Sequence, residues 1–160
     1  MQYSDTLSTI AEVSIALAGF TGVVAVLGRR SSGGWSSEEL LQLRALVETS
    51  LAALFVSFVP GMVSSAVGSE TAVWRWSNGF IAGAHLAILL AFFVRARNAA
   101  PTVGQKILGS VGAGFVLLHL GAAVGIVAWA APLFVLGLLG LLFVAAHNFV
   151  LLLFSVRRAV

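Results

Sequence analysis

The stretch GFIAGAHLAILLAFFVRAR, residues 79–97, is apolar throughout except for His85 and the two arginines that close it. A helix that crosses the hydrocarbon core of a bilayer needs about 20 mostly apolar residues. The stretch has that length, and an ionisable ring in its middle is costly in lipid unless it meets a polar partner. It therefore predicts a membrane-spanning helix in which His85 has a structural or functional reason to be present.

The composition of the whole chain also fits a membrane protein. Of its 160 residues, 59% are hydrophobic and only 9% are charged, whereas about 25% of a soluble domain is charged. Cysteine is absent, which excludes disulfides, thiolate metal sites and cysteine nucleophiles. The net charge of +3 comes without a basic patch interleaved with aromatics, so no nucleic-acid partner is expected. We expect a multi-pass protein of the cell membrane, of the bacterial inner-membrane type, with the lipid bilayer as its surroundings.

Five segments are long and apolar enough to span a bilayer. They are residues 7–28, 42–66, 74–95, 106–129 and 132–156. The last two must be separate helices, because one helix over residues 106–156 would be about 77 Å long at 1.5 Å per residue. The sequence thus predicts an all-α integral membrane protein, a five-transmembrane-helix bundle forming a single domain over residues 1–160. Its longest internal loop, residues 29–36, is short.

The distribution of charge predicts how this bundle is threaded. With five spans, eight of the nine Lys and Arg residues fall on one side of the membrane, and Arg75 alone falls on the other. The eight are Arg29, Arg30, Arg44, Arg95, Arg97, Lys106, Arg157 and Arg158. The positive-inside rule then places the N-terminus outside, and the C-terminus and the loop 29–36 in the cytoplasm. Tyr3, Trp74, Trp76 and Trp129 all map to the outer interface, where an aromatic belt is expected.

Two local patterns refine the second span. Ser36 and Glu39 fit a capping box, in which each side chain accepts a hydrogen bond from the other residue's backbone N–H. This predicts that the helix begins near Ser37. Farther along, Pro60 followed by Gly61 predicts a kink, because proline removes one backbone hydrogen bond. We interpret the kink as a structural bend in preference to a hinge.

Ionisable side chains occur in every predicted span. They are Glu12, Glu48, His85, His119 and His147, with the polar residues Asn78 and Asn148 close by. Counting at 1.5 Å per residue from the aromatic belt places Glu12, His85 and His119 level, roughly 14–15 Å deep. His147 lies deeper, and Glu48 lies near the inner interface with Arg44 one turn away as its simplest expected partner. These residues predict a series of ionisable groups that continues from mid-membrane toward the cytoplasmic side, which we call the Glu/His ladder.

Small residues form stripes on several predicted helices. Helices in lipid associate through close packing, so glycines mark the faces where backbones approach. The candidates for helix packing or an oligomer interface are Gly19, Gly22, Gly79, Gly83, Gly121 and Gly125. Each stripe fits packing within one chain, and we expect at least one of them to join subunits of a homo-oligomer.

These residues are consistent with three alternative functions. The first is a homo-oligomeric channel or a proton- or ion-coupled transport protein that uses the Glu/His ladder, since these groups pass protons near neutral pH. The second is a non-catalytic accessory or assembly subunit of a larger membrane complex, in which the polar residues only join helices. The third is a bundle that binds haem b or a metal ion at His85 and His119.

The first function is the one we expect, without a cofactor. The histidines lack the tight spacing that is typical of metal-ligand pairs. Nor does the sequence contain a nucleophile–base arrangement or a glycine-rich phosphate loop, so we do not expect an enzyme.

Overall fold

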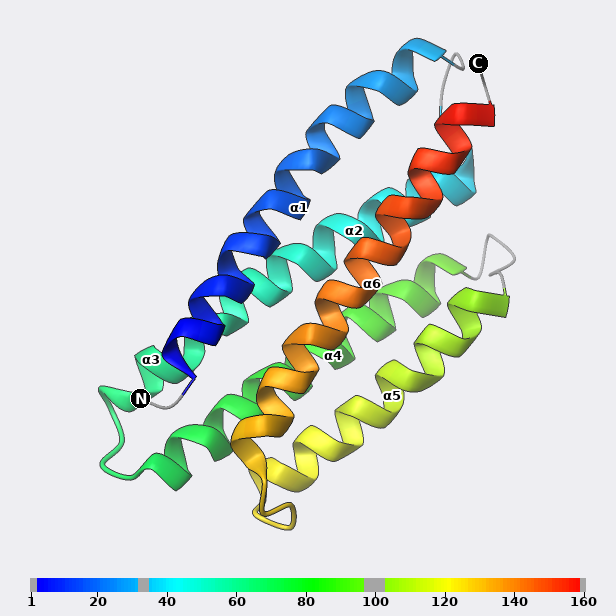
Figure 1. Ribbon diagram of the computed structural model, residues 1–160. Helices are drawn as coiled ribbons and strands as arrows, with labels where there is room; N and C mark the ends of the chain where they lie inside the picture. The colour runs from blue at the N-terminus through cyan, green and yellow to red at the C-terminus, as the bar shows by residue number, and fades with distance from the viewer. Residues whose placement is uncertain (1–2, 32–34, 97–102, 159–160) are drawn as a thin grey trace.

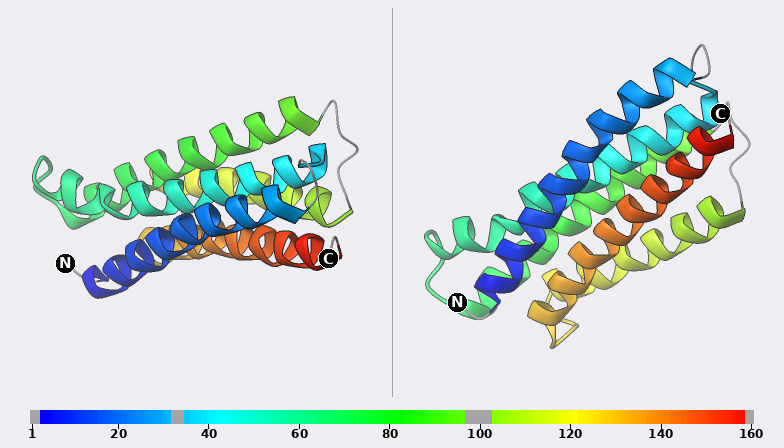
Figure 2. Two further views of the ribbon diagram at one scale, coloured as in Figure 1. Left: turned by 90° about the horizontal axis from the view of Figure 1, so that it is seen from above. Right: turned by 45° about the horizontal axis from the view of Figure 1, so that its top comes forward.

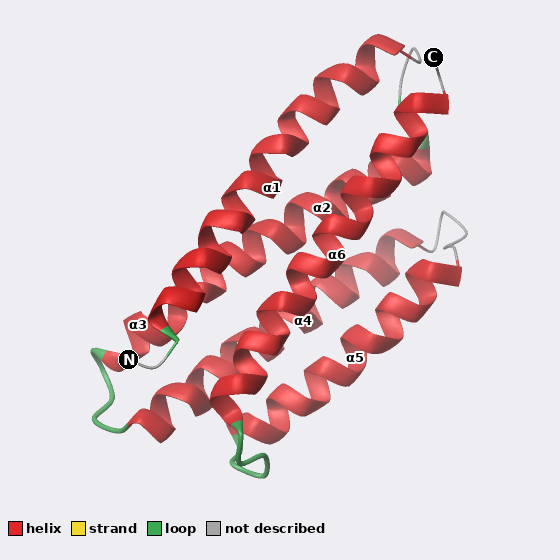
Figure 3. Cartoon of the chain, viewed as in Figure 1, coloured by secondary structure: helices red, strands yellow, loops and turns green. Residues whose placement is uncertain are grey.

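The computed structural model describes residues 3–31, 35–96 and 103–158, and all regular structure within these ranges is α-helical. The helices are α1 (Ser4–Ser31), α2 (Ser37–Ser57), α3 (Val59–Ser64), α4 (Glu70–Ala96), α5 (Val103–Ala123) and α6 (Ala130–Arg158), drawn in Figure 3. With α2 and α3 taken together as one span, the described part of the chain has five helices long and apolar enough to cross a membrane. The prediction of an all-helical chain with five helices long and apolar enough to span a bilayer is confirmed, whereas the insertion of these helices in a membrane and their orientation there stay predictions.

The observed helices extend beyond most of the predicted spans. α1 runs on to Ser31, into the predicted loop 29–36, of which residues 32–34 lie outside the described ranges. The fourth span is instead shorter than predicted, because α5 ends at Ala123 and not at residue 129. It ends in a Schellman motif: the N–H of Ile126 donates to the Gly121 carbonyl at 2.8 Å, and that of Gly125 to the Ala122 carbonyl at 3.1 Å.

Gly125 therefore has a different role from the one predicted. It adopts a φ of +86°, the left-handed conformation that favours glycine. A Cβ at this position would also collide with the guanidinium of Arg75, which donates to the Val124 carbonyl at 2.6 Å. Gly125 is thus a helix-stop residue that admits Arg75, and it does not lie on a packing stripe of α5.

Both local predictions for the second span are confirmed. The hydroxyl of Ser36 accepts from the backbone N–H of Glu39 at 3.2 Å, and the Glu39 carboxylate accepts from that of Ser36 at 2.8 Å. α2 stops at Ser57, and the short helix α3 starts at Val59 with Pro60 in its first turn. The proline lies where a helix accepts it, so the kink is a break between two helices.

The long helices run side by side, with α6 in contact with α1, α2, α4 and α5 (Figures 1 and 2). α5 lies at an edge of the bundle and packs mainly on α4 (Figure 1). We call the end where α4 and α6 begin the tryptophan end, after Trp74, Trp76 and Trp129. The opposite end, where α4 closes with Arg95, is the arginine end.

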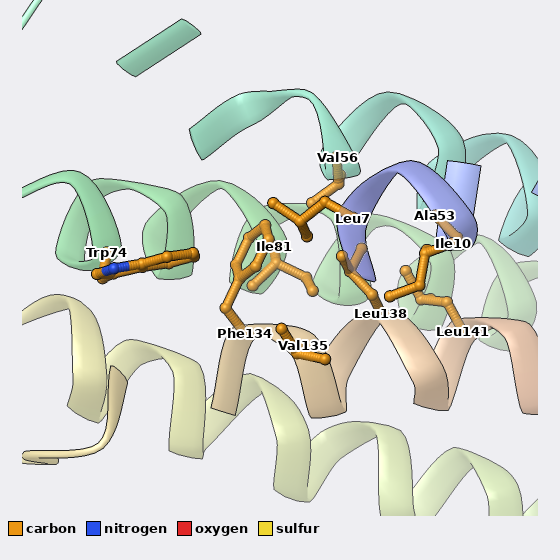
Figure 4. Packing of buried hydrophobic residues seen from close by; sticks show 10 residues of the cluster. All are labelled: Leu7, Ile10, Ala53, Val56, Trp74, Ile81, Phe134, Val135, Leu138 and Leu141. Atoms are coloured by element: carbon orange, nitrogen blue, oxygen red, sulfur yellow. The ribbon is translucent and has the colours of Figure 1, made fainter. Parts of the chain in front are cut away.

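The main hydrophobic core lies in the half of the bundle toward the tryptophan end. Side chains from α1, α2, α4 and α6 converge there, among them Trp74, Ile81 and Phe134 (Figure 4). A smaller cluster around Leu46 and Leu152 joins α1, α2 and α6 nearer the arginine end. Large apolar side chains cover the outside of the helices as well, for example Phe55, which suits a surface in contact with lipid.

Candidate functional site

A buried hydrogen-bond network joins α4, α5 and α6. The side-chain amide of Asn78 donates to the carbonyls of Trp74 at 2.7 Å and Ala130 at 2.8 Å. Because carbonyls only accept, the amide orientation is fixed, and its oxygen faces Nδ1 of His119 at 2.7 Å. Nδ1 of His119 must therefore carry the hydrogen, which leaves a lone pair on Nε2 of the neutral ring.

Gly137 on α6 makes room for the His119 ring. A Cβ at position 137 would overlap with Nε2 of His119 and would lie 2.9 Å from Cδ1 of Ile81. His119 is fully buried, and its Nε2 has no hydrogen-bond partner among the described residues. Gly137 is not among the glycines predicted from the sequence to lie at helix contacts. One sequence feature could have indicated it: Gly137 lies in a strongly apolar predicted span, and a glycine there marks a face on which another helix can approach closely.

His85 lies against His119. Its Nδ1 is 3.1 Å from the Ile81 carbonyl, which can only accept, so this ring too carries its hydrogen on Nδ1 and a lone pair on Nε2. The two imidazoles stack with centroids 5.4 Å apart and an interplanar angle of 23°. Phe115 completes the group, stacking on His85 at 5.6 Å and on His119 at 5.8 Å. We call His85, Phe115 and His119 the ring cluster.

The ring cluster borders a cavity of about 620 Å³ between α2, α4, α5 and α6. His85 and Phe115 form part of its wall, and most of the remaining lining is aliphatic or aromatic. Besides His85, its polar lining consists of Thr49, Asn148 and the pair Glu48 and Arg95. The cavity therefore has apolar walls with an imidazole toward the middle of the bundle and an ion pair toward the arginine end.

The partner of Glu48 differs from the predicted one. Both carboxylate oxygens lie 2.6 Å from Nη1 of Arg95, and each side chain is about one-third exposed. Arg44, the expected partner one turn away on α2, is exposed. The ion pair joins α2 to α4 across 47 positions of sequence. Only the packing of these two helices could reveal it.

The predicted ladder is divided in the structure. Glu12 is exposed on α1, a helix that packs mainly against α2 and α6. His147 is half-buried and stacks on Phe143 of its own helix at 6.4 Å. Asn148 borders the cavity and donates to the Val144 carbonyl at 2.8 Å. The structure thus brings Asn78, His119 and His85 into contact. Glu48 and Asn148 line the same cavity as His85, whereas Glu12 lies apart on α1.

The predicted glycine stripes also fall into two groups. Gly79 and Gly121 have neighbours within the chain that a Cβ would touch at 3.9 Å and 3.4 Å. Gly19, Gly22 and Gly83 are exposed, and nothing lies within 4 Å of a Cβ built on them. The first group packs inside the subunit, and the second leaves open surface on α1 and α4.

Comparison with protein-family models, with curated proteins and with solved structures gave no match to this chain. Within residues 3–31, 35–96 and 103–158, no group of three or more His, Asp or Glu side chains could hold a metal ion. The histidines that we considered as haem ligands stack directly on one another. Two axial ligands would bind iron from opposite faces of the haem, so this geometry does not favour a bis-histidine site.

Proposed function

We propose that this protein is a small proton-coupled transport protein of the cell membrane, which binds an apolar or amphipathic molecule in the cavity and exchanges a proton at His85. One observation carries the proposal: a buried imidazole with an available lone pair borders a cavity of about 620 Å³ inside the apolar helices. The volume lies within the roughly 300–1,000 Å³ range of small-molecule sites.

The stacked histidines are suited to hold one proton between them. Both Nδ1 hydrogens are committed to acceptors, so an added proton must go to an Nε2 atom. With 5.4 Å between the ring centroids, two imidazolium charges would repel by about 3 kcal/mol at an effective dielectric of about 20. The pair should therefore exchange a single proton per cycle, with His85 as the member that borders the cavity.

Transport by alternating access fits the cavity better than conduction through an open pore. Trp74 and Ile81 precede His85 on α4, so the packed core that they form with Phe134 (Figure 4) extends from the level of His85 toward the tryptophan end. A molecule in the cavity would thus need the helices to rearrange before it could leave on that side. A channel would instead need a path between copies of the chain.

Proton flux tests the proposal. In vesicles that contain the protein and a trapped pH-reporting dye, we expect an imposed pH gradient to dissipate faster than in empty vesicles. His85→Gln should slow this flux, because glutamine keeps a polar side chain but does not titrate. His147→Gln is the matched control, since that ring lies outside the ring cluster. Vesicles no leakier than empty ones, or equal loss in both variants, would overturn proton coupling at His85.

A second candidate function is supported by α1. Glu12 is exposed on this helix, as are Gly19 and Gly22. Lipid offers no hydrogen bond to a carboxyl group, whereas a partner helix can, and the glycines let its backbone approach. α1 would then join copies of this chain in a homo-oligomer, or join the chain to a larger membrane complex as an accessory subunit.

A further inference from the structure

We propose that the cavity binds a single-chain amphiphile with an anionic headgroup, of which a fatty-acid carboxylate is the simplest example. The headgroup would bind Arg95, and the chain would extend along α4 toward the ring cluster. The inference deepens the proposed transport function by naming its substrate class. Binding itself requires only the cavity, so it can be tested apart from transport.

The walls of the cavity suit a hydrocarbon chain. Between Arg95 and His85 the lining from α4 is apolar, with Ile88, Leu89 and Phe92. His85 and Arg95 are ten positions apart on α4, which corresponds to about 15 Å along the helix axis. Leu139 on α6 belongs to the same wall. A long, mostly apolar space with its charges at one end matches a molecule with one tail and one charged head.

The ion pair favours a negative headgroup over a positive one. Both contacts of Arg95 to Glu48 use Nη1, and within the described ranges no other hydrogen bond of this guanidinium is seen. A guanidinium has five N–H donors in a planar fork, so Nε and Nη2 can hold a second carboxylate. Both oxygens of Glu48 already face Arg95, which leaves this acid less able to hold a cationic headgroup.

The position of the cavity gives such a molecule a way in from the bilayer. Val111 on α5 and Leu139 and Phe143 on α6 belong to the lining, yet all three are exposed on the outside of the bundle. The cavity thus reaches the apolar surface between α5 and α6, where α5 lies at the edge of the bundle (Figure 1). Molecules dissolved in the membrane would enter here without crossing water.

Coupling to a proton follows from charge balance. A carboxylate inside the bilayer is costly unless a positive charge accompanies it. Arg95 is already neutralised by Glu48, so one proton on the ring cluster would make the loaded cavity neutral. One anion and one proton would then move together.

Binding can be measured in nanodiscs of phosphatidylcholine with stearic acid that is spin-labelled near its methyl end. We expect a motionally restricted signal that unlabelled palmitate displaces. The same label on stearylamine, or on one chain of phosphatidylglycerol, should show no signal that palmitate displaces. Equal restriction of labelled phosphatidylglycerol would overturn the single-chain assignment, and equal restriction of stearylamine would overturn the anionic one.

Two pairs of variants locate the site. Arg95→Gln should weaken binding roughly tenfold through loss of a charge-assisted hydrogen bond, whereas Arg44→Gln removes the same charge from an exposed position of α2 and should not. Gly112→Leu fills the cavity from α5 and should abolish the restricted signal. Gly114→Leu is its control, because nothing lies within 4 Å of a Cβ there. Equal effects within either pair, or no displaceable signal at all, would overturn the proposal.

The outcomes separate the two proposals. Binding without proton flux would retain the amphiphile site and reject transport. Flux that depends on His85 without stearate binding would retain transport and reject this substrate class.

Discussion

The two halves of the α4–α5–α6 unit are built differently. Toward the tryptophan end, Asn78 joins three helices through its amide, and Gly137 lets α6 touch the ring of His119. Toward the arginine end the same helices and α2 line a cavity that reaches the surface between α5 and α6 and contains the ion pair of Glu48 and Arg95. One half is fixed by close packing and by the hydrogen bonds of Asn78, and the other has room for a ligand.

Side-chain size explains much of this difference. Glycine at position 137 allows contact, and at position 140 a Cβ would already lie 3.3 Å from the ring of Phe115. One turn farther along α6 from Gly140, Phe143 lines the cavity and is exposed on the outside of the bundle. A bilayer protein gains little from burying one apolar side chain against another, so helices that lack small or polar contacts can separate.

Gly137→Leu should lower the free energy of unfolding most, because it forces apart the helices of the packed half. The new side chain would collide with His119 and Ile81, and overpacking of this kind costs about 3 kcal/mol or more when neither neighbour can move. Unfolding of the purified protein by denaturant in detergent measures the loss. Gly83→Leu is the control, since a Cβ there has no neighbour within 4 Å. Equal stability of both variants would contradict the packing role of Gly137.

The ion pair of the other half should contribute far less to stability. Glu48 and Arg95 are partly exposed, and such pairs contribute about 0–1 kcal/mol. A double-mutant cycle with Glu48→Gln and Arg95→Gln, followed by the same unfolding measurement, gives the coupling energy. A coupling energy above about 2 kcal/mol would mean that the ion pair holds α2 and α4 together nearly as strongly as close packing holds the other half. The cavity would then not change shape to fit a ligand.

The smallest effect on stability is expected at the exposed face of α1. The chain has no cysteine, so Gly19→Cys introduces a single thiol at an open position. If α1 joins two copies, oxidation in membranes should produce a disulfide-linked dimer while the free energy of unfolding stays unchanged. Gly114→Cys, an exposed site on α5, is the control. Equal or absent cross-linking at both sites would remove the support for an α1 interface.

Features that depend on neighbouring residues in the chain could be predicted from the sequence. Hydrophobic run length identified the five spans, the pair Ser36 and Glu39 identified the start of α2, and Pro60 identified its break. The cost of ionisable groups in lipid also pointed to His85 and His119 before their contacts were known. These inferences are reliable because lipid allows backbone polar groups few alternatives to a helix.

The partners of those residues were decided by tertiary structure. Helical periodicity defines the face of α2 on which Glu48 lies. It does not show that α4 packs on this face and brings Arg95 to Glu48, while Arg44 stays exposed. In the same way, the contact of Asn78 with His119 and the space that Gly137 leaves depend on how three helices are rotated about their axes. Sequence alone determined which segments form helices long and apolar enough to cross a membrane. The long-range packing of those segments decided which polar groups meet and where a cavity remains.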